Sequence, residues 1–264
     1  MKTPMETWNC IKKHCRREWK AAFLSTFLVG IMIHMPIMLR DIPNHDGLAS
    51  MYFDQNMITS GRWFLTVACG ISSYYTLPWL IGLLAMLYLG ITNVLLTEFL
   101  EVRQTWAVMV IGGLVAAFPS LASTFAYVFT MDGYMLAVLL AVLAVLLTKK
   151  YRWGFLPGGL CLAFSLGIYQ SYLPFAVLLC LYGIYQIGAS EGAFREKIKK
   201  IFCYAGMGAI GIAAYYVILR LLLWIQGKEL ASYQGINDMG SAPRTGIAGT
   251  VLQMYRDFLA FTCK

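Results

Sequence analysis

Apolar runs of about 20 residues, separated by short charged segments, dominate this chain. A helix needs about 20 residues to cross the roughly 30 Å hydrocarbon core of a bilayer, because it rises about 1.5 Å per residue. Only 13% of the residues are charged, which is about half the share found in soluble domains. The sequence therefore predicts an all-α fold, a polytopic transmembrane helical bundle.

The apolar runs predict seven spans within a transmembrane domain of residues 21–225. These spans cover 21–39, 78–100, 105–130, 134–147, 155–170, 172–187 and 201–225. Pro119 interrupts the third run, so we expect a kinked helix there. The apolar stretch 63–75 has 13 residues, too few to span, and is expected to form a re-entrant or interfacial helix.

The charged residues predict how the chain is oriented in the membrane. Predicted inside segments hold 14 of the 21 Lys and Arg residues, outside segments hold six, and Arg220 lies within the last span. Because cytoplasmic loops are enriched in Lys and Arg, we expect a multi-pass protein of the cell membrane with a cytoplasmic N-terminus at 1–20. The net charge of +8 is then explained by orientation, and no nucleic-acid partner is expected.

The segment 226–264 forms a predicted extracytoplasmic tail. An amphipathic pattern begins at Thr250 and ends with the chain 15 residues later. The sequence leaves open whether the chain is truncated or belongs to a shortened protein. The seven cysteines include no CxxC pair, so no cysteine metal site is predicted. His34 stands alone in the first span and is expected to pack rather than to bind a ligand.

The first predicted outer loop, residues 40–62, is the main polar stretch between the spans. It reads RDIPNHDGLASMYFDQNMITSGR, and residues 48–55 show the spacing of an amphipathic helix lying on the membrane. Ionisable groups at the membrane edge are costly and therefore candidates for function. The candidates in this loop are Asp41, Asn44, His45, Asp46, Asp54 and Arg62, and Asp132 is expected on the same side of the membrane.

Carboxylates and an arginine on one side of the membrane suit sugar transfer from a lipid phosphate. A carboxylate can act as general base on a sugar hydroxyl, and an Arg can bind a phosphate with two hydrogen bonds. The acids could also hold a divalent metal, although this chemistry does not demand one. Three alternatives stay open from the residues alone: solvated loop charges, a transporter or lipid-linked-sugar flippase, and a non-catalytic scaffold.

Motifs along residues 20–220 resemble GT-C-type membrane glycosyltransferases, in particular the O-antigen-modifying glucosyl transferase II family. The motifs are RDIPNHDG from Arg40, GRW at 61–63, FPSLASTFAYVFTMDGYMLAVLLAVLAVLL from Phe118 and SLGIYQSYLPFAVLLCLY from Ser165. The resemblance implies a GT-C-like bundle that transfers a hexose, glucose, from a polyprenyl-phosphate carrier. The acceptor would be a cell-surface glycan or glycolipid at the extracytoplasmic face, and the anomeric configuration would invert.

The resemblance also assigns roles to particular residues. Asp46 falls where the family has its loop acid, and Gly61–Arg62 matches a Gly–Arg pair. His45 stands where a second acid is expected, so Asp41 or Asp54 would supply it. Tyr169 and Gln170 match the family's YQS and join Arg62, His45, Asn44 and Asp132 as expected substrate-binding residues. Taken in isolation, the YQS residues are equally explained by hydrogen bonding between helices.

Overall fold

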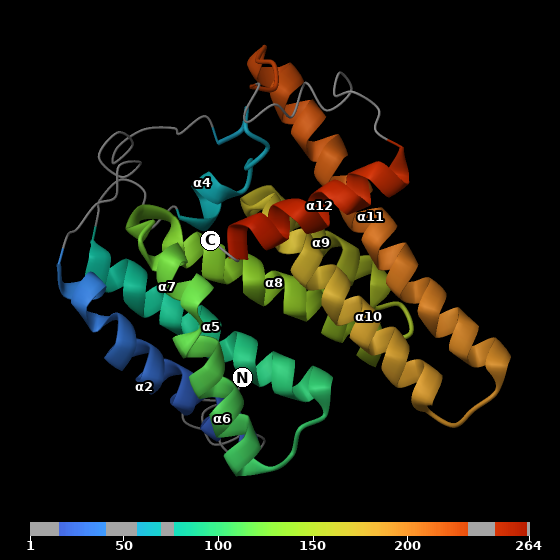
Figure 1. Cartoon of the computed structure of the whole chain (residues 1–264), viewed down its shortest axis with the longest axis horizontal. Helices are drawn as coiled ribbons and strands as arrows, with labels where there is room; N and C mark the ends of the chain where they lie inside the picture. The colour runs from blue at the N-terminus through green and yellow to red at the C-terminus, as the bar shows by residue number, and fades with distance from the viewer. Residues whose placement is uncertain (1–15, 41–56, 70–76, 232–245, 263–264) are drawn as a thin grey trace, which may run out of the picture. The chain divides into compact units, whose positions relative to one another are not determined.

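The computed structural model describes residues 16–40, 57–69, 77–231 and 246–262, and every regular element in them is helical (Figure 1). This confirms the predicted all-α fold. The elements are α2 (Arg17–Leu39), α4 (Leu65–Ala68), α5 (Pro78–Leu100), α6 (Thr105–Ala117), α7 (Pro119–Phe125), η1 (Val128–Thr130), α8 (Met131–Lys150), α9 (Phe155–Ile168), η2 (Gln170–Tyr172), α10 (Leu173–Ala189), α11 (Phe194–Gln226) and α12 (Ile247–Thr262).

Several of these helices meet the length and apolarity that a bilayer requires. Five single helices qualify among the described residues, and the bent pair α6–α7 makes a sixth. The remaining predicted span falls on α9, which has 14 residues and reaches only about 21 Å at 1.5 Å per residue. The chain is therefore a polytopic helical membrane protein, and the count of seven spans stays a prediction that depends on α9.

One span is bent at Pro119 as predicted, and another begins earlier than predicted. The third run breaks at Phe118, whose extended backbone is the conformation favoured before a proline, and the two halves meet at 47°. Helix α8 begins at Met131, three residues before the predicted start, with Asp132 in its first turn. A carboxylate is favourable there because the helix N-terminus carries a partial positive charge.

Helix α8 lies at the centre of the bundle (Figure 1). It packs against α5 on one side and α9 on the other, α9 packs against α11, and α2 packs against α5 and α6. In the most apolar stretch of the span that contains α8, 67% of the residues are buried, whereas in the spans that contain α10 and α11 only 17% are. The outer helices consequently present large apolar side chains to their surroundings, as lipid-facing helices do.

Polar side chains inside the bundle join neighbouring helices. His34 of α2 is buried, its Nε2 lies 3.0 Å from the carbonyl oxygen of Ala116, and its ring stacks on Phe125 at 3.8 Å. This agrees with the packing role expected for it. Asn93 of α5 is fully buried, and its Nδ2 donates to the carbonyl of Ala22 at 3.1 Å and to Thr26 Oγ1 at 2.9 Å.

Replacing Asn93 by Ala should lower the free energy of unfolding by about 1–2 kcal/mol, because hydrogen bonds between membrane helices contribute about 0.6–1.7 kcal/mol. The measurement is the thermal midpoint of the purified protein in detergent. Gln226→Ala removes an exposed amide at the end of α11 and should leave the midpoint unchanged. Equal midpoints for Asn93→Ala and the wild-type protein would contradict the structural role of Asn93.

Cations gather around Glu98 at the C-terminal end of α5. Its carboxylate accepts hydrogen bonds from Arg16 at 3.0 Å, from the Trp19 indole at 2.7 Å and from Arg103. Lys150 lies 4.0 Å away, and the Glu98 side chain is only 8% exposed. The cluster fastens the start of α2 and the segment before α6 to one end of the bundle.

Residues 231–264 form a compact unit separate from residues 1–230. Its described part is α12, a helix that covers most of the amphipathic pattern noted in the tail. Apolar residues occupy one face of α12, with Leu252, Tyr255 and Phe258 all more than half exposed. On the polar face the Gln253 amide donates to Asp257 at 2.8 Å.

Candidate functional site

Residues 57–69 form a short segment that packs onto the bundle beside the C-terminal halves of α9 and α11. The Phe64 amide donates to the carbonyl of Gly167 at 2.8 Å. The Trp63 ring covers Gly167, where a Cβ atom would lie 2.6 Å from the indole. Trp63 also belongs to an apolar cluster with Leu219 of α11. These contacts hold Trp63 and Phe64 against the bundle. Arg62 lies directly before them in the chain and directly after Gly61, so its backbone position is fixed as well.

Gly61 occupies a site that only glycine fits. Its φ of +82° lies in the left-handed region, which side chains with a Cβ atom disfavour. A Cβ atom there would lie 2.4 Å from Gln170 Nε2 and 2.5 Å from Tyr215 Oη. Gln170 Nε2 donates to the carbonyl of Ser60 at 3.1 Å and to Tyr215 Oη at 2.9 Å, and Tyr215 Oη donates to the carbonyl of Gly61 at 3.1 Å.

The Arg62 guanidinium lies over an aromatic cluster. Its central carbon is 4.8 Å from the ring centre of Tyr169. Tyr169 stacks on Tyr134 of α8 at 5.0 Å and meets Tyr172 edge-on at 5.8 Å. A guanidinium held over a ring is oriented by cation–π attraction, and its planar fork of N–H donors matches the oxygens of a phosphate. The arrangement can therefore bind an anion at a defined place.

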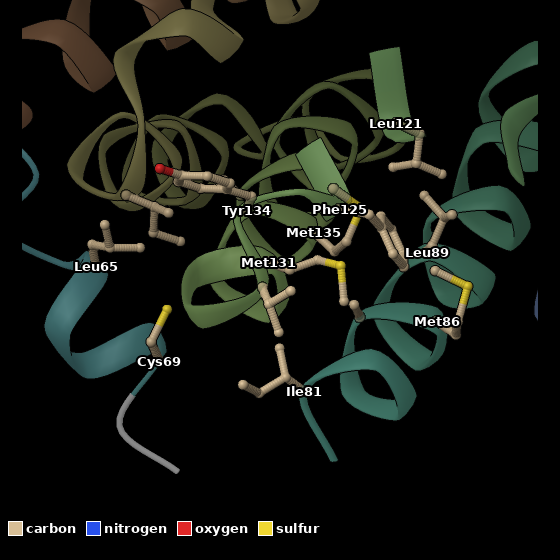
Figure 2. Close-up of a cluster of buried hydrophobic side chains, with 14 of the residues drawn as sticks. Leu65, Cys69, Ile81, Met86, Leu89, Leu121, Phe125, Met131, Tyr134 and Met135 are labelled. Carbon is tan, nitrogen blue, oxygen red and sulfur yellow. The ribbon is translucent and has the colours of Figure 1, made fainter. Parts of the chain in front are cut away.

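Asp132 is a buried carboxylate beside this cluster, with 1% of its surface exposed. It accepts a hydrogen bond from the Gly133 amide at 2.9 Å and lies next to the Cys69 thiol. Figure 2 shows Cys69 and Leu65 facing the first turns of α8, where Met131 and Tyr134 lie. Burial and the Asp132 carboxylate raise the pKa of the Cys69 thiol, which therefore stays protonated at neutral pH.

An apolar pocket of about 450 Å³ lies beside the break between α6 and α7. Its lining comes from α5, α6, α7, α8, η2 and α10, and includes Leu89, Phe118, Leu121, Met135, Tyr172 and Phe175. Tyr172 belongs both to this lining and to the aromatic cluster under Arg62. Two ring contacts therefore link the pocket to the arginine, one from Tyr172 to Tyr169 and one from Tyr169 to Arg62.

A family model described as glucosyl transferase GtrII matches residues 35–259 of the 264-residue chain. The chain belongs to this family. No curated protein and no solved structure shows a significant match to it. Membership of the GtrII family confirms the resemblance inferred from the motifs. It makes this membrane protein a glycosyltransferase that acts on a sugar donor and a glycan acceptor.

Four of the residues expected at the GtrII site lie in the described part of the chain. Arg62, Tyr169 and Gln170 come together from segments more than 100 residues apart. Asp132 lies two residues before Tyr134, which stacks on Tyr169. The other five, and the amphipathic helix expected at 48–55, lie outside the described residues, and their roles stay predictions. These five are Asp41, Asn44, His45, Asp46 and Asp54.

Three tyrosines of the site were not predicted from the sequence. Tyr134 and Tyr172 lie within the GtrII-like motifs, as the residues that follow DG and QS, so the motifs could have indicated them. Tyr215 lies in the middle of an apolar run beside Tyr216. Such a pair is typical of aromatic residues at a membrane interface and gives no sign of a contact with Gly61.

The sequence allowed, without requiring it, that the acids of the loop 40–62 bind a divalent metal. In the described ranges no group of three or more His, Cys, Asp or Glu side chains could hold a metal ion. The loop acids Asp41, Asp46 and Asp54 lie outside those ranges. The option of a divalent metal at these acids therefore stays a prediction.

Proposed function

We propose that this GtrII-family protein transfers glucose from a polyprenyl-phosphate carrier to a cell-surface glycan or glycolipid at the extracytoplasmic face of the membrane. The observation that supports the proposal best is a series of side-chain contacts that joins a cation to an apolar pocket. It leads from the Arg62 guanidinium over Tyr169, through Tyr172, and into the apolar pocket. A polyprenyl phosphate has the same order of parts, an anion followed by an apolar chain.

In the proposed reaction a loop carboxylate, Asp46 first, removes the proton from the acceptor hydroxyl. The acceptor oxygen attacks C1 of the glucose while the bond between C1 and the carrier phosphate oxygen breaks. Polyprenyl phosphate leaves with the bonding electrons, and Arg62 compensates the negative charge that develops on it. Attack opposite the leaving group inverts the anomeric carbon, as the family resemblance implies.

The distribution of charge supports an extracytoplasmic site. Helix α8 is 20 residues long, which corresponds to about 30 Å, and it separates the two ends of the bundle. Asp132 lies in its first turn on the side of Arg62, and Lys150 lies in its last turn on the side of Glu98. Because cytoplasmic ends are rich in Lys and Arg, the Glu98 end and the N-terminus would face the cytoplasm.

The test uses purified protein in liposomes with radiolabelled polyprenyl-phosphate glucose and a glycan acceptor. The expected result is labelled glycan together with released polyprenyl phosphate. Narrowing the pocket by Val138→Phe should raise KM for the lipid donor by at least about fivefold, because overpacking costs about 1–3 kcal/mol and 1.4 kcal/mol corresponds to a factor of about ten. KM for the acceptor should not change.

Val177→Phe is the matched control, because Val177 is 47% exposed on α10 and does not line the pocket. Equal donor KM values for the two variants would remove the pocket from the proposal. Movement of labelled lipid-linked sugar across the liposome without any product would instead favour a transporter or flippase.

A further inference from the structure

We propose that Tyr215 is a positioning residue for glucosyl transfer: together with Gln170 it holds the backbone in front of Arg62 and thereby sets where the guanidinium meets the donor. The inference deepens the proposed function and rests on the phosphate-binding role proposed for Arg62. Tyr215 comes from α11, and Arg62 lies 153 positions earlier in the sequence.

We call the side chains of Gln170 and Tyr215 the clamp; three hydrogen bonds join them to each other and to the backbone before Arg62. Gln170 Nε2 donates to the carbonyl of Ser60 at 3.1 Å and to Tyr215 Oη at 2.9 Å. Tyr215 Oη in turn donates to the carbonyl of Gly61 at 3.1 Å. The phenol therefore acts as acceptor and donor at once, which a hydroxyl can do and a phenyl ring cannot. The two carbonyls belong to the two residues directly before Arg62.

The fit between clamp and backbone leaves no room for a side chain at position 61. Gly61 approaches Gln170 and Tyr215 so closely that a Cβ atom would lie 2.4–2.5 Å from their polar atoms. Its left-handed φ of +82° turns the chain at that point. The direction in which the chain enters Arg62 is therefore set by Gly61 and by the two side chains around it.

The clamp and the surface under the guanidinium belong to one stretch of chain. Gln170 follows Tyr169, whose ring lies 4.8 Å below the Arg62 guanidinium carbon. A shift of Gln170 would therefore displace the ring and the backbone of Arg62 together. Because reacting groups must be held in a narrow range of geometry, a misplacement of about 1 Å can cost a hundredfold in rate. Tyr215 acts in this way through Arg62, without contact to the donor.

The test is a double-mutant cycle with Tyr215→Phe and Arg62→Lys, measured as kcat/KM for polyprenyl-phosphate glucose in purified protein. Tyr215→Phe should lower kcat/KM about tenfold, since it removes only the hydroxyl and loosens the clamp. In the Arg62→Lys background the same change should have less than about a twofold effect, because a lysine cannot use the fixed fork geometry. The thermal midpoint should stay within about 4 °C of wild type.

Tyr216→Phe is the matched control on the neighbouring residue. Its hydroxyl also takes part in a hydrogen bond, accepting from Arg220 Nε at 2.8 Å, but this pair lies away from Gly61. Tyr216→Phe should transfer glucose at the wild-type rate. Gln170→Met removes the amide that donates to Ser60 and Tyr215. It should lower kcat/KM as Tyr215→Phe does, and its effect should likewise be small in the Arg62→Lys background.

The outcomes separate the two proposals. Suppose that Arg62→Lys lowers kcat/KM. If Tyr215→Phe then has no effect on kcat/KM, or lowers it by the same factor in the wild-type and Arg62→Lys backgrounds, the positioning role of Tyr215 is overturned and Arg62 keeps its role. If Arg62→Ala transfers glucose at the wild-type rate, the phosphate-binding role itself is overturned. A Tyr215→Phe loss matched by Tyr216→Phe would also overturn the inference, because it would show a general effect on α11.

Discussion

Replacing Asp46 by Asn should abolish transfer of glucose from the lipid carrier in intact membranes. Asn has nearly the shape of Asp but cannot accept a proton, so the acceptor hydroxyl would have to attack without a base. General base catalysis contributes about 10²–10⁴-fold to rate, and a loss of this size would leave no product detectable above background. The measurement is the incorporation of labelled glucose into the acceptor by membranes that contain equal amounts of each variant.

An exposed carboxylate outside the predicted outer loop provides the control for this prediction. Glu191 is exposed in the connection between α10 and α11, and Glu191→Gln should transfer glucose at the wild-type rate. Wild-type transfer by Asp46→Asn would remove Asp46 as the base. The same assay on Asp41→Asn and Asp54→Asn would then identify which remaining loop acid takes the proton.

Replacing Arg62 by Ala should lower kcat/KM for the lipid donor by about 10²–10³-fold, the usual cost of removing a donor that stabilises developing charge. The loss arises because the leaving phosphate no longer meets a fixed cation. The fold should survive, since the cation–π contact of the half-buried Arg62 contributes only about 0.5–2 kcal/mol. Kinetics with purified protein and a thermal melt on the same sample separate these effects.

Arg152→Ala is the matched control for Arg62→Ala, because it removes an exposed arginine before α9, away from Tyr169. It should leave kcat/KM unchanged. Arg62→Lys should fall between Arg62→Ala and wild type, since it keeps the charge without the planar fork. A donor KM and kcat that do not respond to Arg62→Ala would place the phosphate contact elsewhere in the site.

The membrane helices were the part of the fold that the sequence predicted well. Apolar length alone located α2 and α5, and Pro119 located the break between α6 and α7. The start of α8 was placed too late because hydropathy excludes a charged residue such as Asp132. In the folded protein, local hydrogen bonds and neighbouring side chains accommodate that carboxylate in a first helical turn.

The site was predicted only in part, and the reason is physical. Arg62, Tyr169 and Gln170 lie in motifs, so the sequence could indicate each of them. Which groups they contact depends on tertiary packing, which residue spacing does not contain. The Gln170 amide, for example, was expected in isolation to bond between helices; it donates to Tyr215 of α11 and also to the carbonyl of Ser60, which the spacing did not indicate. Tyr215 itself has no local signal in its apolar run.

The clamp on Gly61 has a consequence for the order in which the protein is made. The Gly61 carbonyl leaves the ribosome long before Tyr215, which follows it by 154 residues. Until α11 has been synthesised and inserted, the backbone before Arg62 lacks one of its two clamping side chains. A nascent chain released before α11 would therefore carry every loop acid and the arginine and still have no positioned site. The contact between Tyr215 and the backbone before Arg62 can thus form only after α11 has been made.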